Sequence, residues 1–169
     1  NDWAPEWHAR RALSALDHTT YLAEAMPAAT LRFGALLTVL AVLADGEYDY
    51  HSDSAWIRPV PDLWERSVPT FDPSSEAVQG MERCLRAVAD AVGDRGLVNP
   101  PCLLDGLTTI SGFRTPAQLC LDVLERPADV LRWSDALTTL YIAAYDHFYR
   151  LVTSWGYGDT TTWLSAMAE

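Results

Sequence analysis

One long helical pattern near the carboxyl end constrains the fold more than any other feature of the chain. After Pro127, apolar side chains recur every three or four residues until Gly156 interrupts the pattern. The positions on this stripe are Val130, Trp133, Leu137, Leu140, Tyr141, Ala144, Phe148, Leu151, Val152 and Trp155. At ~1.5 Å per residue the pattern predicts a helix about 40 Å long. Because the stripe is broad and rich in aromatic residues, we expect it to pack against a core rather than to form a cofactor pocket.

Several other helices are indicated by caps and by periodicity. They cover Pro5 to about Met26, Leu31 to Ala44, the stretch from Asp72 and Pro73 to Gly93, Leu107 to Phe113, and Pro116 to about Glu125. The helix over 31–44 is apolar nearly all round, so it must be covered on most sides. Thr115 and Gln118 form a capping box, in which the Thr hydroxyl accepts from the Gln118 backbone N–H and the Gln side chain reaches back.

Strand signals are few beside so many helices. They occur at Glu47 to His51, Ala55 to Pro59, Leu97 to Leu104, and Thr160 to Leu164. This imbalance predicts an α/β fold, a helix-rich partial (β/α)8 TIM-type barrel in which residues 1–169 form a single domain. The last strand pattern breaks off at the carboxyl end, so we expect the chain to be part of a longer barrel.

The charge composition excludes some functions. The chain has a formal net charge of −11, and all 12 of its basic residues are Arg. Without Lys, neither Schiff-base chemistry nor a P-loop nucleotide site can be built within this chain. An acidic surface repels phosphate backbones and anionic lipids, so we expect neither nucleic-acid binding nor membrane binding.

The cysteines and the amino terminus indicate a cytoplasmic setting. Cys84, Cys102 and Cys120 are far apart and lie in apolar stretches, as buried free thiols do in a reducing compartment. No CxxC or HxxxH pair occurs, so we expect no zinc site built wholly from this chain. The amino terminus lacks the features of a signal peptide, and the longest mainly apolar run is well short of the ~20 residues that span a bilayer.

Several stretches together are similar to one family. They are Phe33 to Ala44, Trp56 to Pro59, Phe71 to Pro73, Asp105 to Leu107, Phe113 to Val123, Glu125 to Val130, and Gly156 to Trp163. The order resembles the amino-terminal half of the uroporphyrinogen decarboxylase-like superfamily, which also includes corrinoid-dependent methyltransferases. The resemblance covers roughly Leu31 to the end and is most specific from Arg114 to Val130.

The resemblance implies a (β/α)8 barrel of about twice this length, in agreement with the strand count. The decarboxylase's Arg-rich signature is not visible, because Arg10 and Arg11 lie in a helix without its context. The methyltransferase branch takes its zinc ligands from the later half of the barrel. We therefore expect no cofactor within this chain, and zinc or a corrinoid would belong to the complete protein.

Barrel geometry selects the candidate site residues, because catalytic groups follow the carboxyl ends of parallel strands. Asp105 is the candidate catalytic residue, as a general base or as a contact for a cationic substrate; the alternative is a turn made with Gly106. Trp163 would form a wall of the substrate pocket, or else core packing, and Ser165 would contact substrate or be an ordinary exposed hydroxyl. Arg114 would hold a substrate carboxylate in bidentate fashion, or else be an exposed Arg at a helix entrance. No metal ligand is predicted.

Two classes of function remain open. The first is an enzyme of the decarboxylase or methyltransferase type, a lyase or a transferase, that acts on a carboxylated or methylated small molecule. The second is a non-catalytic role, in which the segment binds a ligand or associates with itself. An open half-barrel would leave strand edges and apolar faces uncovered, so we expect a homo-oligomer or a chain completed by a carboxyl-terminal half.

Overall fold

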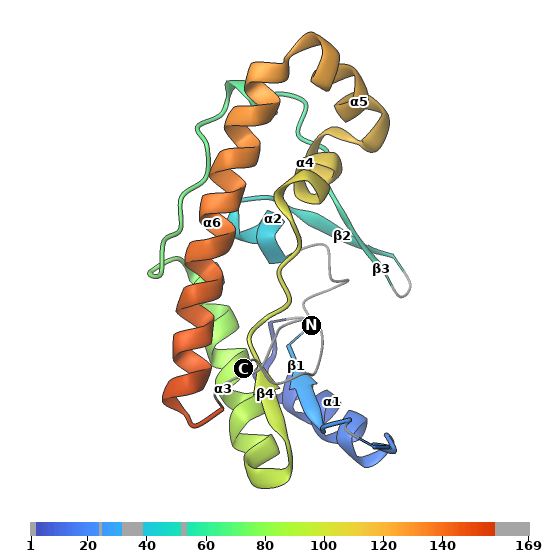
Figure 1. Ribbon diagram of the computed structural model, residues 1–169, viewed down its shortest axis with the longest axis vertical. Coiled ribbons are helices and arrows are strands. Elements are labelled where there is room, and N and C mark those ends of the chain that lie inside the picture. The colour runs from blue at the N-terminus through green and yellow to red at the C-terminus, as the bar shows by residue number, and fades with distance from the viewer. Residues whose placement is uncertain (1–2, 24, 32–38, 52–53, 158–169) are drawn as a thin grey trace. The chain divides into compact units, whose positions relative to one another are not determined.

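The computed structural model describes residues 3–23, 25–31, 39–51 and 54–157 (Figure 1). Its helices are α1 (Pro5–Asp17), α2 (Val39–Leu43), α3 (Glu76–Val92), α4 (Gly106–Arg114), α5 (Pro116–Glu125) and α6 (Pro127–Ser154). Its strands are β1 (Ala28–Thr30), β2 (Tyr48–His51), β3 (Ser54–Ile57) and β4 (Leu97–Asn99), and two 3-10 turns cover Leu63–Glu65 and Gly93–Arg95. The described residues therefore form a helix-rich α/β structure with few strands.

The chain divides into two compact units. The first unit comprises Asn1–Phe33, Pro73–Cys102 and Tyr145–Glu169, and the second comprises Gly34–Asp72 and Leu103–Ala144. Helix α6 contributes its first part to the second unit and its last part to the first. None of the helices in the described ranges combines the length and the apolar character needed to cross a bilayer.

The first unit contains a parallel pair of strands. Strand β1 pairs with β4 in a register that joins Ala28 to Leu97, and Thr30 to Asn99 (Figure 1). Gly96 lets β4 begin close beside Pro27, because a Cβ at Gly96 would lie 2.7 Å from the Pro27 carbonyl oxygen. The sequence pattern did not predict β1. It predicted a strand over Leu97 to Leu104, which is longer than the observed β4. Pro100 and Pro101, which have no N–H to donate, end β4 at Asn99.

Helices α1 and α3 pack together in the first unit. The predicted α3 is confirmed, and its apolar positions Val78, Met81, Leu85, Val88 and Val92 are all buried. Its cap differs from the prediction: the Ser75 hydroxyl, rather than Asp72, accepts from the Val78 backbone N–H at 3.3 Å.

The predicted first helix is too long. Helix α1 ends at Asp17, where the His18 backbone N–H donates to the Ser14 carbonyl. Leu22, which the pattern placed on this helix, is 72% exposed. An apolar residue at the right spacing does not extend a helix when nothing covers it, because helix stability comes mainly from packing.

The second unit contains an antiparallel hairpin and a hydrophobic core. Strands β2 and β3 confirm the predicted pair, with Tyr48 opposite Ile57 and Asp49 opposite Trp56. The core residues of this unit are Leu40, Ala41, Val60, Leu63, Trp64, Ile110, Phe113, Val130, Trp133, Leu137 and Leu140. Within this core the Phe113 and Trp133 rings meet edge to face, at 6.4 Å between centroids. The stripe predicted on α6 thus packs as core.

Other predictions are confirmed in part. Helices α5 and α6 begin at Pro116 and Pro127 as predicted. Helix α4 buries Ile110 and Phe113, but Leu107 is 51% exposed and does not share their face. Most of the helix predicted from Leu31 to Ala44, and the strand predicted at Thr160 to Leu164, lie outside the described residues. The predicted barrel and the single domain stay predictions, because the described strands form one parallel pair and one hairpin.

Gly112 provides a test of the packing in the second unit. A Cβ at this position in α4 would lie 2.9 Å from the Cβ of Ile57 on β3. In an exposed helix, replacing Gly by Ala stabilises by about 1 kcal/mol. Here we expect Gly112→Ala to lower the free energy of unfolding by about 1–3 kcal/mol, because the added methyl overpacks the contact. Urea denaturation measures this change, and a more stable variant would mean that helix propensity outweighs the contact.

Candidate functional site

The carboxyl ends of β1 and β4 lie side by side because the two strands are parallel. Their last residues, Thr30 and Asn99, are register partners, and the Asn99 Nδ2 donates to the Thr30 Oγ1 at 3.0 Å. Parallel strands of α/β proteins place ligands at this edge. The fold therefore brings two polar side chains together where such proteins build their sites.

The Asn99 side chain is only half satisfied at this edge. Asn99 is 0% exposed, and its Oδ1 has no hydrogen-bond partner among the residues that the structure describes. A buried oxygen left without a donor costs about 1–3 kcal/mol. The sequence does contain a signal for this residue: Asn99 is a polar residue at the end of an apolar strand, just before two prolines.

Asp105 caps helix α4. Its Oδ1 accepts from the Thr108 backbone N–H at 2.8 Å, and its Oδ2 accepts from the Thr108 hydroxyl at 2.7 Å. Desolvation raises the pKa of Asp105, but the hydrogen bonds from Thr108 and from the helix backbone outweigh it, so the pKa lies below its ordinary value. These contacts agree with a local capping role, and the predicted catalytic role stays a prediction.

Two substitutions at Asp105 separate capping from chemistry. Ser is as good an N-cap as Asp, so Asp105→Ser changes the free energy of unfolding by less than about 0.5 kcal/mol, whereas Asp105→Ala lowers it by about 1 kcal/mol. Thermal or urea unfolding measures both. Equal losses in the two variants would contradict the capping account, and lost activity in the stable Asp105→Ser protein would support the catalytic role.

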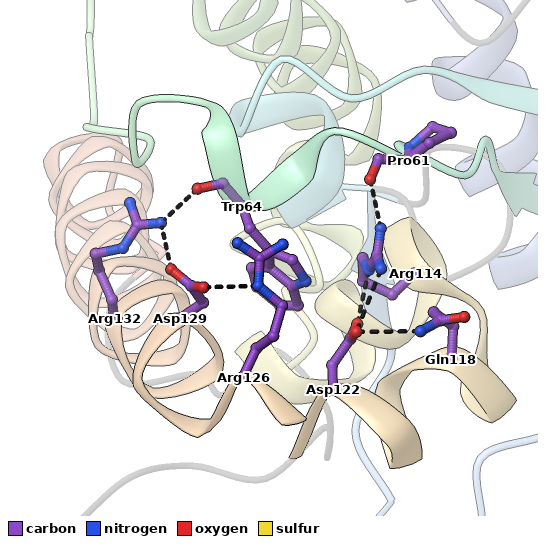
Figure 2. Close-up of polar contacts among 8 residues, drawn as sticks. All are labelled: Pro61, Trp64, Arg114, Gln118, Asp122, Arg126, Asp129 and Arg132. Carbon is purple, nitrogen blue, oxygen red and sulfur yellow. Dashed lines mark hydrogen bonds and ion pairs between the residues drawn. The ribbon is translucent and has the colours of Figure 1, made fainter. Parts of the chain in front are cut away.

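Arg114 forms a buried ion pair with Asp122, as Figure 2 shows. Its Nε donates to the Asp122 Oδ2 at 2.7 Å, its Nη2 to the Oδ1 at 3.3 Å, and its Nη1 to the Pro61 carbonyl at 2.6 Å. The guanidinium also lies over the Trp64 ring, 5.4 Å from the centroid. The Arg114 and Asp122 side chains are 11% and 2% exposed, so the alternative of an exposed Arg at a helix entrance is wrong.

These contacts engage all three nitrogens of the Arg114 guanidinium within the protein. The predicted role of Arg114 in binding a substrate carboxylate stays a prediction. The bidentate geometry expected for a substrate is instead observed with Asp122. The Asp122 carboxylate thus takes the place at the Arg114 guanidinium that the sequence reasoning assigned to a substrate carboxylate.

The turn between α4 and α5 makes this pairing possible. Thr115 has a φ of 70°, in the region that favours glycine, and its hydroxyl accepts from the Gln118 backbone N–H at 3.4 Å as the capping box predicts. The other predicted contact of the capping box, in which the Gln118 side chain reaches back, is wrong. The Gln118 Nε2 donates instead to the Asp122 Oδ1 at 3.1 Å. The helix entrance is therefore shaped around the Asp122 carboxylate.

Helix α5 buries a carboxylate and exposes most of its apolar residues. Asp122 is its buried residue, whereas Cys120, Leu121, Val123 and Leu124 are exposed, Leu124 to 80%. Leu119 packs against the core of this unit, but these four side chains face away from it, which periodicity alone predicts the other way round.

The ion pair holds the pKa of Asp122 below its ordinary value. Hydrogen bonds from Arg114 are the main cause and outweigh the desolvation that raises the pKa, and Gln118 and Trp64 lower it further. A second group of charges lies beside it in Figure 2. There Asp129 accepts from both Arg126 and Arg132, and Arg132 also donates to the Trp64 carbonyl at 2.7 Å.

Removing Asp122 tests how much the second unit depends on the pair. Asp122→Ala leaves the Arg114 charge buried without its partner, so we expect the free energy of unfolding to fall by about 3 kcal/mol. Asp146 provides a matched control, since its pair with Arg150 is exposed. Asp146→Ala should cost less than about 0.5 kcal/mol in the same urea titration. A loss at Asp122 as small as the control loss would contradict the account.

The same carboxylate predicts a pH dependence. Because the pKa of Asp122 is lower in the folded protein than in the unfolded chain, its contribution is fully present above the unfolded value. The contribution is lost as pH falls through the folded pKa, and Asp122→Asn should flatten this part of the stability curve. Denaturation midpoints at a series of pH values below 5 measure the effect, and parallel curves for the two proteins would contradict it.

The remaining candidate residues divide into described and undescribed positions. Trp163 and Ser165 lie outside the described residues. Cys84 and Cys102 are buried and form no disulfide, as expected, and burial raises the pKa of Cys84 to about 11, but Cys120 is exposed, contrary to expectation. Across the described ranges, no group of three or more His, Cys, Asp and Glu residues is placed to hold a metal ion.

Comparisons with known proteins bear on the fold. No protein-family model and no curated protein matches the chain. Among solved structures, a methyltransferase from Methanosarcina mazei aligns with 93% of this chain at a TM-score of 0.61 and 15% sequence identity. The chain spans 44% of the length of that protein. At this identity the likeness shows the fold alone: the chain has the fold of the aligned part of that methyltransferase.

Proposed function

We propose that this chain is part of a methyltransferase of the uroporphyrinogen decarboxylase-like superfamily, which moves a methyl group to or from a small molecule. The observation that carries the proposal is the structural likeness to the Methanosarcina methyltransferase, which extends over nearly the whole chain. The sequence resemblance, most specific from Arg114 to Val130, supports the same superfamily. The parallel pair β1–β4 fits a barrel of this type.

Methyl transfer is favoured over decarboxylation for two reasons. The structural neighbour is a methyltransferase. In addition, three arginines of the second unit are bound by carboxylates of the chain itself: Arg114 by Asp122, and Arg126 and Arg132 by Asp129. A decarboxylase that binds a polycarboxylated ligand needs guanidinium groups free to face it.

The described residues do not fit a zinc centre. The buried thiols Cys84 and Cys102 are not grouped with further ligands in the described ranges, and burial raises the pKa of Cys84, which opposes the thiolate form that zinc requires. Zinc or a corrinoid in the complete protein would therefore be held by residues other than these. The role of this chain is to shape the substrate site, with Asp105 as the proposed acid-base residue.

A non-catalytic, self-associating role is the alternative, and the surface of the second unit favours it. Leu121, Val123 and Leu124 on α5 and Leu131 on α6 are large apolar side chains exposed in the described structure. Three of these side chains fall within four residues of α5, and exposed apolar side chains close together are typical of surfaces that contact another protein. Self-association alone is compatible with methyl transfer, since many enzymes form oligomers, so the non-catalytic role is distinguished by the lack of either reaction.

The test of the proposed function is a methyl-transfer assay on the intact natural protein. With ¹³C-methylcobalamin as donor and a panel of small thiols, amines and phenols as acceptors, we expect a methylated product at a rate at least about 100-fold above the protein-free reaction, as an enzyme provides. Product formation is followed by ¹³C NMR. Asp105→Ser should slow it, whereas Asp62→Asn, which removes an exposed carboxylate paired with Arg66, should not.

Two outcomes would overturn the proposal. Release of carbon dioxide from a carboxylated tetrapyrrole, without methyl transfer, would assign the protein to decarboxylation. Neither reaction, together with a concentration-dependent oligomer in analytical ultracentrifugation, would assign it the self-associating role.

A further inference from the structure

The half-satisfied amide of Asn99 is a polar group that the fold leaves in need of a partner. Its Nδ2 donates to the Thr30 hydroxyl, and its buried Oδ1 has no hydrogen-bond partner in the described structure. The following residues cannot supply one from the backbone, because Pro100 and Pro101 have no N–H. A Leu at this position would fill similar space without leaving a polar atom unpaired.

The position of this oxygen points to a ligand rather than to packing. Thr30 and Asn99 end two neighbouring parallel strands, and the carboxyl ends of such strands are where α/β proteins bind small molecules. Asn99 is enclosed, but its neighbour Thr30 is only half-buried, so this end of the pair is not sealed from solvent. The hydrogen bond to Thr30 fixes the amide plane and thereby aims the free oxygen.

We propose that Asn99 is a substrate-binding residue whose Oδ1 accepts a hydrogen bond from an N–H or O–H group of a small, uncharged molecule. The free atom of the carboxamide is an acceptor without formal charge, so it pairs with an N–H or O–H donor and not with a phosphate or carboxylate oxygen. Thr30 is a positioning residue that holds the amide. The choice of methylated probes in the test below rests on the proposed function. The expected preference of the site for a molecule with an N–H or O–H donor does not.

Matched probes that differ by one donor test the proposal in the intact protein. N-methylacetamide has an N–H that N,N-dimethylacetamide lacks, and 2-methoxyethanol has an O–H that 1,2-dimethoxyethane lacks. We expect the protic member of at least one pair to bind about fivefold to tenfold more tightly, the ratio that one neutral hydrogen bond provides. Binding is measured by ¹H–¹⁵N NMR titration, which needs no turnover and therefore stays informative if methyl transfer is not observed.

Three variants assign the preference to Asn99. Asn99→Leu should abolish the protic preference, and Thr30→Val should reduce it by freeing the amide to rotate. Val98→Ala is the matched control: Val98 is equally buried on the same strand, but successive side chains of a strand point to opposite faces. It should lower stability and leave the preference unchanged.

The outcomes decide the proposal in either direction. A protic preference that is lost in Asn99→Leu and kept in Val98→Ala supports it. The proposal is overturned if the wild-type protein shows no protic preference in either pair, or if the preference survives in Asn99→Leu. An unchanged preference together with a loss of stability in Asn99→Leu would show that the oxygen binds an internal water or a protein group.

Discussion

The parallel pairing of β1 with β4 is the constraint on which the architecture of the first unit depends. Parallel strands cannot be joined by a tight turn, so everything from Leu31 to Gly96 has to form the connection between them. Helix α3 is the last long element of that connection, and it packs with α1. The pairing also puts both carboxyl ends at one edge. A polar residue at the end of either strand therefore meets its neighbour from a distant part of the sequence, as Thr30 and Asn99 do.

The second unit is governed by a different interaction, the ion pair of Arg114 with Asp122. A buried charge pair is tolerated only when its remaining hydrogen-bonding capacity is filled. Here the Pro61 carbonyl and the Gln118 amide do this, and the Trp64 ring lies against the guanidinium. The pair draws Asp122 of α5 inward and leaves Leu121, Val123 and Leu124 exposed. The same residues that stabilise the α4–α5 corner thus create the apolar surface that a partner could cover.

Local signals in the sequence were sufficient for the helices that have them. The starts of α5 and α6 follow from Pro116 and Pro127, and the end of α3 follows from Gly93, because caps and helix-breaking residues act over a few positions. Strand β1 could not be found this way. Ala28 and Ala29 have little strand preference, and they become a strand only because β4 pairs with them.

The residues of the candidate site could likewise be predicted only in part. Sequence reasoning selected Asp105 from its place after a strand and Arg114 from its place just before a helix, and both are engaged in contacts within the chain. It did not find Asp122 as the partner of Arg114, because that contact depends on the unusual Thr115 backbone and on the close approach of two helices. Nor did it select Asn99, since an unfilled hydrogen bond appears only when the surroundings of the side chain are known.

The central claim is that the carboxyl ends of β1 and β4 form a ligand site in a methyltransferase-type fold. A crystal structure of the intact natural protein grown with N-methylacetamide tests it most directly. The account predicts further strands parallel to β1 and β4, and the amide N–H of the probe within ~3 Å of the Asn99 Oδ1. A protein N–H or O–H bound to this oxygen, with the probe bound elsewhere or not at all, would contradict the claim.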